Sequence, residues 1–140
     1  MTSDYLIDTS AIVRLLRKPE VRDKWAPAIS GGLVAYCDVT ELEMIRSVRT
    51  CAEEDRLRER LEAMFSWAPM PEQVFTRARE VQRKLVAAGQ HRGPGPVDLL
   101  LAATAELSDL AILHYDADFE CVAKVTGQGT RWLAPRGTLD

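Results

Sequence analysis

Short apolar runs alternate with longer amphipathic segments along the chain. The runs are too short for helices and are bounded by turn-forming or polar residues, which is typical of buried strands. The predicted strands cover residues 4–8, 33–36, 66–68, 111–115 and 130–133. Between them, apolar residues recur every three or four positions, which indicates helices. The predicted helices cover residues 9–18, 20–29, 38–49, 53–65, 71–88, 96–109 and 119–125.

This alternation of strands and helices favours a parallel sheet covered by helices. The sequence therefore predicts an α/β fold: a three-layer α/β/α sandwich around a central, mostly parallel sheet of four to five strands. A chain of 140 residues is long enough for one domain with its own core. Because no linker, repeat or low-complexity tract interrupts the pattern, we predict a single domain over residues 1–140.

The composition is that of a globular protein, with 46% apolar and 28% charged residues. No apolar stretch approaches the roughly 18 residues that a membrane span needs, and the N-terminus lacks the features of a signal peptide. Cys37, Cys51 and Cys121 form an odd set without Cys-x-x-Cys spacing. We interpret them as reduced thiols of a cytoplasmic protein, without a disulfide framework or a zinc site.

Two predicted strands end in an aspartate. Asp8 follows the first apolar run and Asp116 follows the run at residues 111–115. Ligands bind outside the carboxyl ends of the strands in an open parallel sheet. Both carboxylates are therefore expected at the ligand-binding edge.

A third acid, Asp98, lies in the first turn of a helix that is apolar nearly all round and therefore predicted to be buried. An acid at this position can simply complement the helix dipole. However, Ala102 and Ala105 follow on the same face and predict room for a ligand beside Asp98.

Carboxylates that lie close together raise one another's pKa, and a hard divalent cation relieves this repulsion. Mg²⁺ and Mn²⁺ take oxygen ligands and often bridge to phosphate groups. His91 lies in a Gly/Pro-rich loop and His114 in a strand. We interpret them as a surface residue and a satisfied, half-buried residue, so they indicate no other metal. The chain also lacks a P-loop and a Gly-x-Ser-x-Gly nucleophile motif.

Four short motifs occur in a fixed order that spans most of the chain: residues 7–11 (IDTSA), 40–43 (TELE), 96–103 (PVDLLLAA) and 114–119 (HYDADF). With these motifs the chain resembles PIN domains and, among them, the VapC toxins of bacterial toxin–antitoxin pairs. The resemblance implies a metal-dependent endoribonuclease that is in general dimeric and is held inactive by a cognate VapB antitoxin.

The resemblance also implies a set of site residues. The implied catalytic residues are Asp8, Glu43, Asp98 and Asp116. The implied ligands of Mg²⁺ or Mn²⁺ are Asp8, Asp98, Asp116 and Asp118. Ser10 matches a position that supports the site through its hydroxyl. Such a cation would polarise a phosphodiester oxygen and lower the pKa of a bound water, and the cut would leave a 5′-phosphate and a 3′-hydroxyl.

The second acid of this set has a competitor two residues away. Helical periodicity places Glu41 within the apolar arc of the predicted 38–49 helix and Glu43 beyond its edge. Asp38-x-x-Glu41 also resembles a capping box, which would give Glu41 a structural role. The motif spacing matches Glu43, and we predict that Glu43 is the catalytic residue.

Basic residues flank the acids on both sides, at Arg14, Arg17 and Lys18 and at Arg77, Arg79, Arg83, Lys84 and Arg92. We predict that Arg14, Arg83 and Arg92 contact the RNA backbone, and that the RNA is single-stranded, where its sequence can be read. The alternative for each of them is an ordinary solvated face.

Other classes of protein fit less well. Haloacid-dehalogenase-like enzymes need a second Asp where this chain has Ser10, and receiver domains need an early acid pair and a late lysine that are not evident. The remaining alternative is a non-catalytic, metal- or RNA-binding PIN-like module.

Overall fold

The computed structural model describes residues 3–139, which contain five strands and seven helices. In chain order the elements are β1 (Tyr5–Ile7), α1 (Thr9–Arg17), α2 (Pro19–Ser30), β2 (Val34–Tyr36), α3 (Asp38–Ile45), α4 (Cys51–Met64), β3 (Ser66–Trp67), α5 (Val74–Ala87), α6 (Pro96–Leu107), β4 (Ala111–His114), α7 (Asp118–Thr126) and β5 (Thr130–Trp132).

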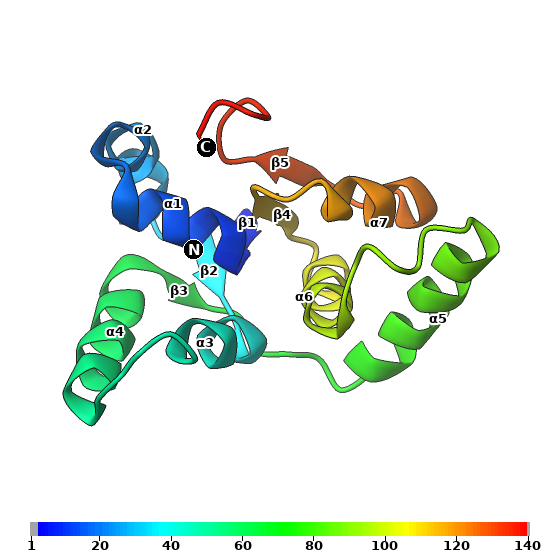
Figure 1. Ribbon diagram of the computed structural model, residues 1–140, viewed down its shortest axis with the longest axis horizontal. Coiled ribbons are helices and arrows are strands. Elements are labelled where there is room, and N and C mark those ends of the chain that lie inside the picture. Colours follow the sequence, from blue (N-terminus) through cyan, green and yellow to red (C-terminus); the bar gives the residue numbers. More distant parts are fainter. Residues whose placement is uncertain (1–2, 140) are drawn as a thin grey trace.

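The five strands form one parallel sheet in the order β3-β2-β1-β4-β5. Helices α5, α6 and α7 lie on one side of it, and α1, α2 and α4 lie on the other (Figure 1). Successive residues of β1 alternate between these layers: Leu6 packs with the first group of helices and Ile7 with the second. The predicted three-layer α/β/α sandwich is therefore confirmed, with five strands that are all parallel.

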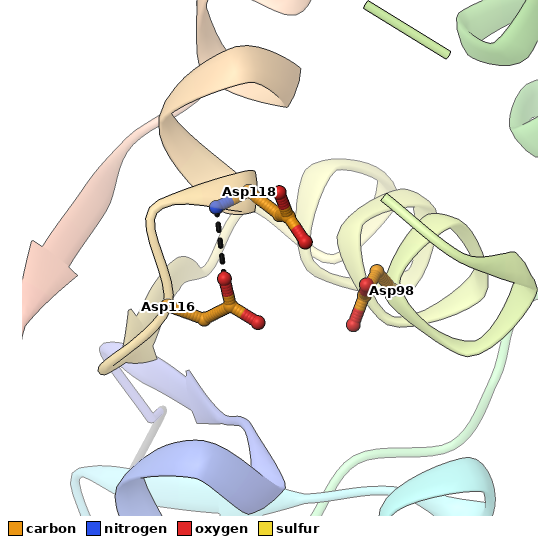
Figure 2. Close-up of side chains that lie close together, drawn as sticks. All are labelled: Asp98, Asp116 and Asp118. Atoms are coloured by element: carbon orange, nitrogen blue, oxygen red, sulfur yellow. Dashed lines mark hydrogen bonds between the residues drawn. The ribbon is translucent and has the colours of Figure 1, made fainter. Parts of the chain in front are cut away.

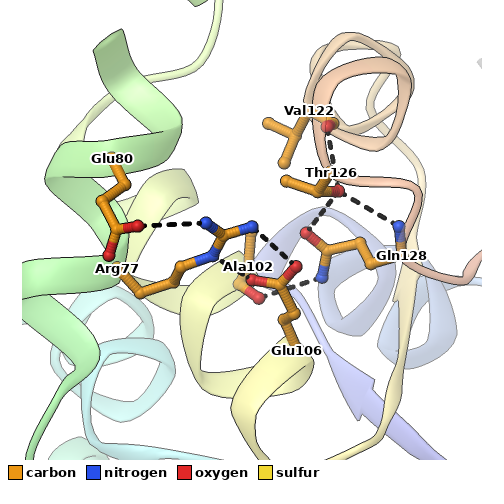
Figure 3. Close-up of polar contacts among 7 residues, drawn as sticks. All are labelled: Arg77, Glu80, Ala102, Glu106, Val122, Thr126 and Gln128. Atoms are coloured by element: carbon orange, nitrogen blue, oxygen red, sulfur yellow. Dashed lines mark hydrogen bonds and ion pairs between the residues drawn. The ribbon is translucent and has the colours of Figure 1, made fainter. Parts of the chain in front are cut away.

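Polar contacts join the three helices of one layer (Figure 3). Arg77 of α5 donates from Nε and Nη2 to the two carboxylate oxygens of Glu106 of α6, at 2.5 and 3.0 Å. Gln128, just after α7, donates from Nε2 to the carbonyl oxygen of Ala102 at 3.0 Å. Glu106 thus occupies the guanidinium of Arg77, one of the basic residues that flank the acids in the sequence.

Helix α3 is shorter than the predicted 38–49 helix and begins differently. Its N-cap is Cys37, without a side-chain hydrogen bond, so the predicted capping role of Asp38 and Glu41 is wrong. The helix ends at Ile45. The hydroxyl of Ser47 donates to the carbonyl oxygen of Met44 at 2.9 Å, a local bond that competes with further helix formation.

No helix within residues 3–139 combines the length and the apolar character that crossing a lipid bilayer requires.

Candidate metal centre

Asp8 lies where β1 ends and α1 begins. Its Oδ2 accepts a hydrogen bond from the backbone N–H of Ser10 at 2.9 Å, so Asp8 itself is the N-cap of α1. The side chain is buried, and desolvation raises the pKa of Asp8 against the lowering effect of hydrogen bonds from Ser10. The charge of Glu43 raises the same pKa further.

Ser10 joins the start of α1 to the segment that follows β4. Its hydroxyl oxygen accepts a hydrogen bond from the backbone N–H of Tyr115 at 2.9 Å. Arg14 closes the same corner, because its Nη1 donates to the carbonyl oxygen of Ser10 at 2.8 Å and its guanidinium lies 4.5 Å from the centre of the Tyr115 ring. Ser10 thus fixes the position of the strand end that carries Asp8 relative to the loop that carries Asp116.

Asp98 lies in the first turn of α6, which begins at Pro96. Its Oδ2 accepts a hydrogen bond from the backbone N–H of Gly95 at 3.0 Å, so the carboxylate stabilises the N-terminus of the helix. Ala102 and Ala105 are buried among core side chains, so the room for a ligand predicted beside them is filled.

The surroundings of Asp98 disfavour its charged form. The pKa of Asp98 is raised from 3.8 to about 6. Desolvation is the largest cause and the hydrogen bond from Gly95 opposes it, while the charges of Asp8, Asp116 and Glu43 add smaller increases in that order of size. These four predicted acids therefore interact electrostatically in the folded chain. A carboxylate in this state gains from any cation that joins it.

Asp116 and Asp118 complete the cluster from the loop after β4 and the start of α7. The backbone N–H of Asp118 donates to Oδ1 of Asp116 at 2.9 Å, and both carboxylates turn toward Asp98 (Figure 2). One carboxylate oxygen from each of the three residues lies within 4.8 Å of the other two. Oxygens bound to one Mg²⁺ are about 3 Å apart when adjacent and about 4 Å when opposite, so small side-chain movements would fit all three to one ion.

His114 is fully buried at the end of β4, which corrects its interpretation as half-buried. Its Nδ1 accepts a hydrogen bond from the backbone N–H of Asp116 at 3.1 Å, while Nε2 has no hydrogen-bond partner within the described residues. Burial lowers the pKa of His114 to about 4, so the ring is neutral near pH 7. This neutral ring positions the backbone of Asp116, a role that the sequence interpretation missed although the two residues are only two positions apart.

The two glutamates of α3 have different surroundings. Glu41 pairs with Arg58 of α4. Glu43 is half-buried beside Val97 of α6, and its charge acts on Asp8 and Asp98. This placement favours Glu43 over Glu41 as the acid of the site. Within the part of the chain that the structure describes, neither Asp8 nor Glu43 belongs to the group of three closely spaced ligands.

The fold and the site together define a class of protein. It is an all-parallel α/β domain with carboxylates gathered at the carboxyl edge of its sheet. The family model for the PIN domain matches residues 5–125. The chain belongs to the PIN-domain family and, within it, to the VapC proteins.

Two relatives from Mycobacterium tuberculosis align over nearly the whole chain. Ribonuclease VapC51 is 44% identical over 140 residues and covers 100% of both chains. Ribonuclease VapC2 is 45% identical over 135 residues, which are 94% of each chain. Among solved structures, DNA-bound VapBC from Salmonella typhimurium matches the fold with a TM-score of 0.77 at 14% identity and covers 94% of this chain and 99% of that chain.

Proposed function

We propose that this protein is the toxin of a type II toxin–antitoxin pair and acts as a Mg²⁺- or Mn²⁺-dependent endoribonuclease. The observation that carries the proposal is the group formed by Asp98, Asp116 and Asp118, whose ligand oxygens lie within 4.8 Å of one another. RNA as the substrate is supported by the VapC relatives, which are named ribonucleases.

The donor set fits a hard divalent cation. All three ligands are carboxylates, and no ion pair to Asp98, Asp116 or Asp118 occurs among residues 3–139. Asp8, at the end of β1, is proposed as a further ligand because its charge acts on Asp98. A cation held there would polarise a phosphodiester oxygen and lower the pKa of a bound water.

The chain's own residues position the reactants. Asp8 and Asp98 hold their geometry through hydrogen bonds from Ser10 and Gly95, so their orientation is fixed before substrate arrives. Glu43, at the rim of the cluster, is proposed to orient the attacking water. Cleavage would leave a 5′-phosphate and a 3′-hydroxyl.

Basic side chains near this edge are proposed to hold the RNA backbone. Arg83 and Arg92 are exposed, and Arg92 precedes Gly93, which lies against Asp118. Arg14 is half-buried over the ring of Tyr115, at the border of the site. Phosphate contacts of this kind give affinity without sequence preference and weaken as salt rises. Single-stranded RNA remains the proposed form of the substrate.

The first test is removal of divalent cations. We expect the purified protein to cut RNA with Mg²⁺ or Mn²⁺, to stop in EDTA, and to recover when the cation is restored, because only oxygen ligands line the site. Cleavage is followed on a labelled single-stranded RNA, with mapping of the new 5′ ends. Undiminished cleavage in EDTA would refute the metal mechanism. Cation binding without any cleavage would instead favour a non-catalytic, metal- or RNA-binding PIN-like module.

A VapB-type antitoxin is the proposed partner, and a homodimer is the proposed state of the toxin. A guanidinium from the antitoxin would satisfy the clustered carboxylates in place of the cation, because charge-assisted hydrogen bonds between arginine and carboxylate are strong. We propose a cytoplasmic location, where such a pair would meet its RNA.

The partner is tested by expression. We expect the chain alone to arrest growth and co-expression of the small protein encoded beside it to restore growth. Both proteins should co-purify. In the cleavage assay, excess Mn²⁺ should weaken inhibition by the partner if that inhibition depends on an arginine bound in place of the cation. Asp98→Asn, expressed alone to the same level, is the control and should be harmless. Normal growth with the active chain alone would argue against a toxin.

A further inference from the structure

The loop between α5 and α6 passes directly over the first turn of α7. Gln90 accepts a hydrogen bond from the thiol of Cys121 through its Oε1, at 3.1 Å. Three residues further on, the backbone of Gly93 faces the carboxylate of Asp118. A Cβ atom at position 93 would lie 2.7 Å from Oδ1 of Asp118 and 3.4 Å from its Cγ. The first distance is shorter than a non-bonded carbon and oxygen tolerate, so any side chain at position 93 would displace this carboxylate.

The backbone at Gly93 does not itself require glycine. Gly89, at the start of the same loop, has a φ of 71°, a conformation that favours glycine whatever its surroundings. Gly93 is not among the residues with positive φ, and neither is Gly95, whose φ is −86°. A Cβ at Gly95 would lie 4.0 Å from Oδ2 of Asp98, an ordinary contact. What sets Gly93 apart is therefore the space that Asp118 occupies.

We propose that Gly93 is a positioning residue, which by lacking a side chain leaves the space in which the Asp118 carboxylate turns toward Asp98 and Asp116. The inference rests on the proposed function, since it assumes that these three carboxylates hold a cation. The backbone N–H of Asp118 is fixed by Oδ1 of Asp116, so a clash at position 93 rotates the carboxylate and leaves the helix start in place. One of the three oxygen ligands then leaves the group.

The test is Mn²⁺ binding, measured by calorimetry on the full chain and paired with melting in EDTA. Gly93→Ala should weaken Mn²⁺ binding about tenfold, the loss typical when a group that orients a metal ligand is removed. Its melting temperature in EDTA should stay within about 3 °C of wild type, because the clash meets only the tip of a side chain. Gly129→Ala makes the same change outside the site and is the matched control. It should bind Mn²⁺ within about twofold of wild type, because its Cβ would lie 3.4 Å from the Cβ of Ala111, an ordinary contact.

A double variant separates the proposed cause from a general disturbance of the loop. In the Asp118→Ala background the clash has no target, so adding Gly93→Ala should change Mn²⁺ binding by less than about twofold. A tenfold loss in that background would overturn the proposal, as would wild-type binding by Gly93→Ala alone or a wild-type chain that binds no Mn²⁺. Failure of the proposed function has a different result: wild type binds Mn²⁺, Gly93→Ala weakens it, and neither protein cuts RNA.

Discussion

Asp98→Asn should abolish RNA cleavage and, at the same time, raise the melting temperature of the metal-free protein. The change removes one proposed cation ligand, and losing several kcal/mol of transition-state stabilisation corresponds to a fall in rate of about 10³-fold or more. It also removes a charge that burial and three neighbouring acids disfavour. The side-chain oxygen of Asn can still accept the hydrogen bond from Gly95, so the start of α6 is preserved.

The stabilisation should depend on pH with a definite sign. Folding raises the pKa of Asp98 from 3.8 to about 6, so its protonated form is favoured in the folded chain. The contribution of Asp98 to the stability of the wild-type protein is therefore fully present below about pH 4 and is lost as pH rises through about 6. The melting temperatures of variant and wild type in EDTA should therefore be similar near pH 4, separate up to about pH 7 and then stay apart. Asp55→Asn, on the exposed face of α4, is the control and should leave both cleavage and this pH profile unchanged. An Asp98→Asn protein that melts well below wild type near pH 7 would make Asp98 a structural residue.

Glu43→Gln should lose most RNA cleavage, about 10²-fold or more, while its melting temperature changes little. A group that orients a nucleophile through its charge typically contributes a factor of this size. Glu43 is half-buried next to Val97, and its charge reaches both Asp8 and Asp98. Cleavage is compared under saturating Mg²⁺, so that a weaker affinity for the cation is not mistaken for a slower reaction.

Glu41→Gln is the matched control, since it makes the same change two residues away on the same helix. Its carboxylate pairs with Arg58, and Gln keeps a hydrogen-bond acceptor for the guanidinium. We expect full cleavage and a small loss of stability. This loss should shrink at high salt, because salt screens the ion pair that only the wild type has. The reverse result, with Glu41→Gln inactive and Glu43→Gln active, would transfer the catalytic role to Glu41.

The fold was predictable because its signals are local. Apolar runs such as those before Asp8 and Asp116 are short enough to identify buried strands, and Pro and Gly residues bound the helices between them. The carboxyl ends of neighbouring parallel strands meet at one edge, so an acid after each strand is a prediction about distance as well as about sequence. Asp116 agrees with that expectation, since it lies in the group with Asp98 and Asp118. Asp8 lies outside this group of three, although its charge acts on Asp98.

Contacts between distant segments were not predictable in this way. Periodicity places Leu42 in the apolar arc of its helix, but the side chain is 65% exposed because this short helix buries Thr40 and Met44 instead. The pairing of Glu41 with Arg58 joins two helices whose packing no local pattern describes. From the sequence, Ser10 could equally cap a helix or support the site. The hydrogen bond from the backbone N–H of Tyr115 to its hydroxyl depends on a segment far away in the sequence, so it could not be predicted.

The strand order has a consequence for when the enzyme can act during its own synthesis. β1 is the middle strand, and β4, which pairs with it on the side of the site, begins only at Ala111. The carboxylates that follow β4 can thus approach Asp8 only after the long segment between β1 and β4 has been synthesised, and pairing between strands so far apart in sequence is slow. A chain that stops before β4 lacks Asp116 and Asp118. A nuclease assembled in this order lacks part of its carboxylate cluster for as long as the residues before β4 are being synthesised.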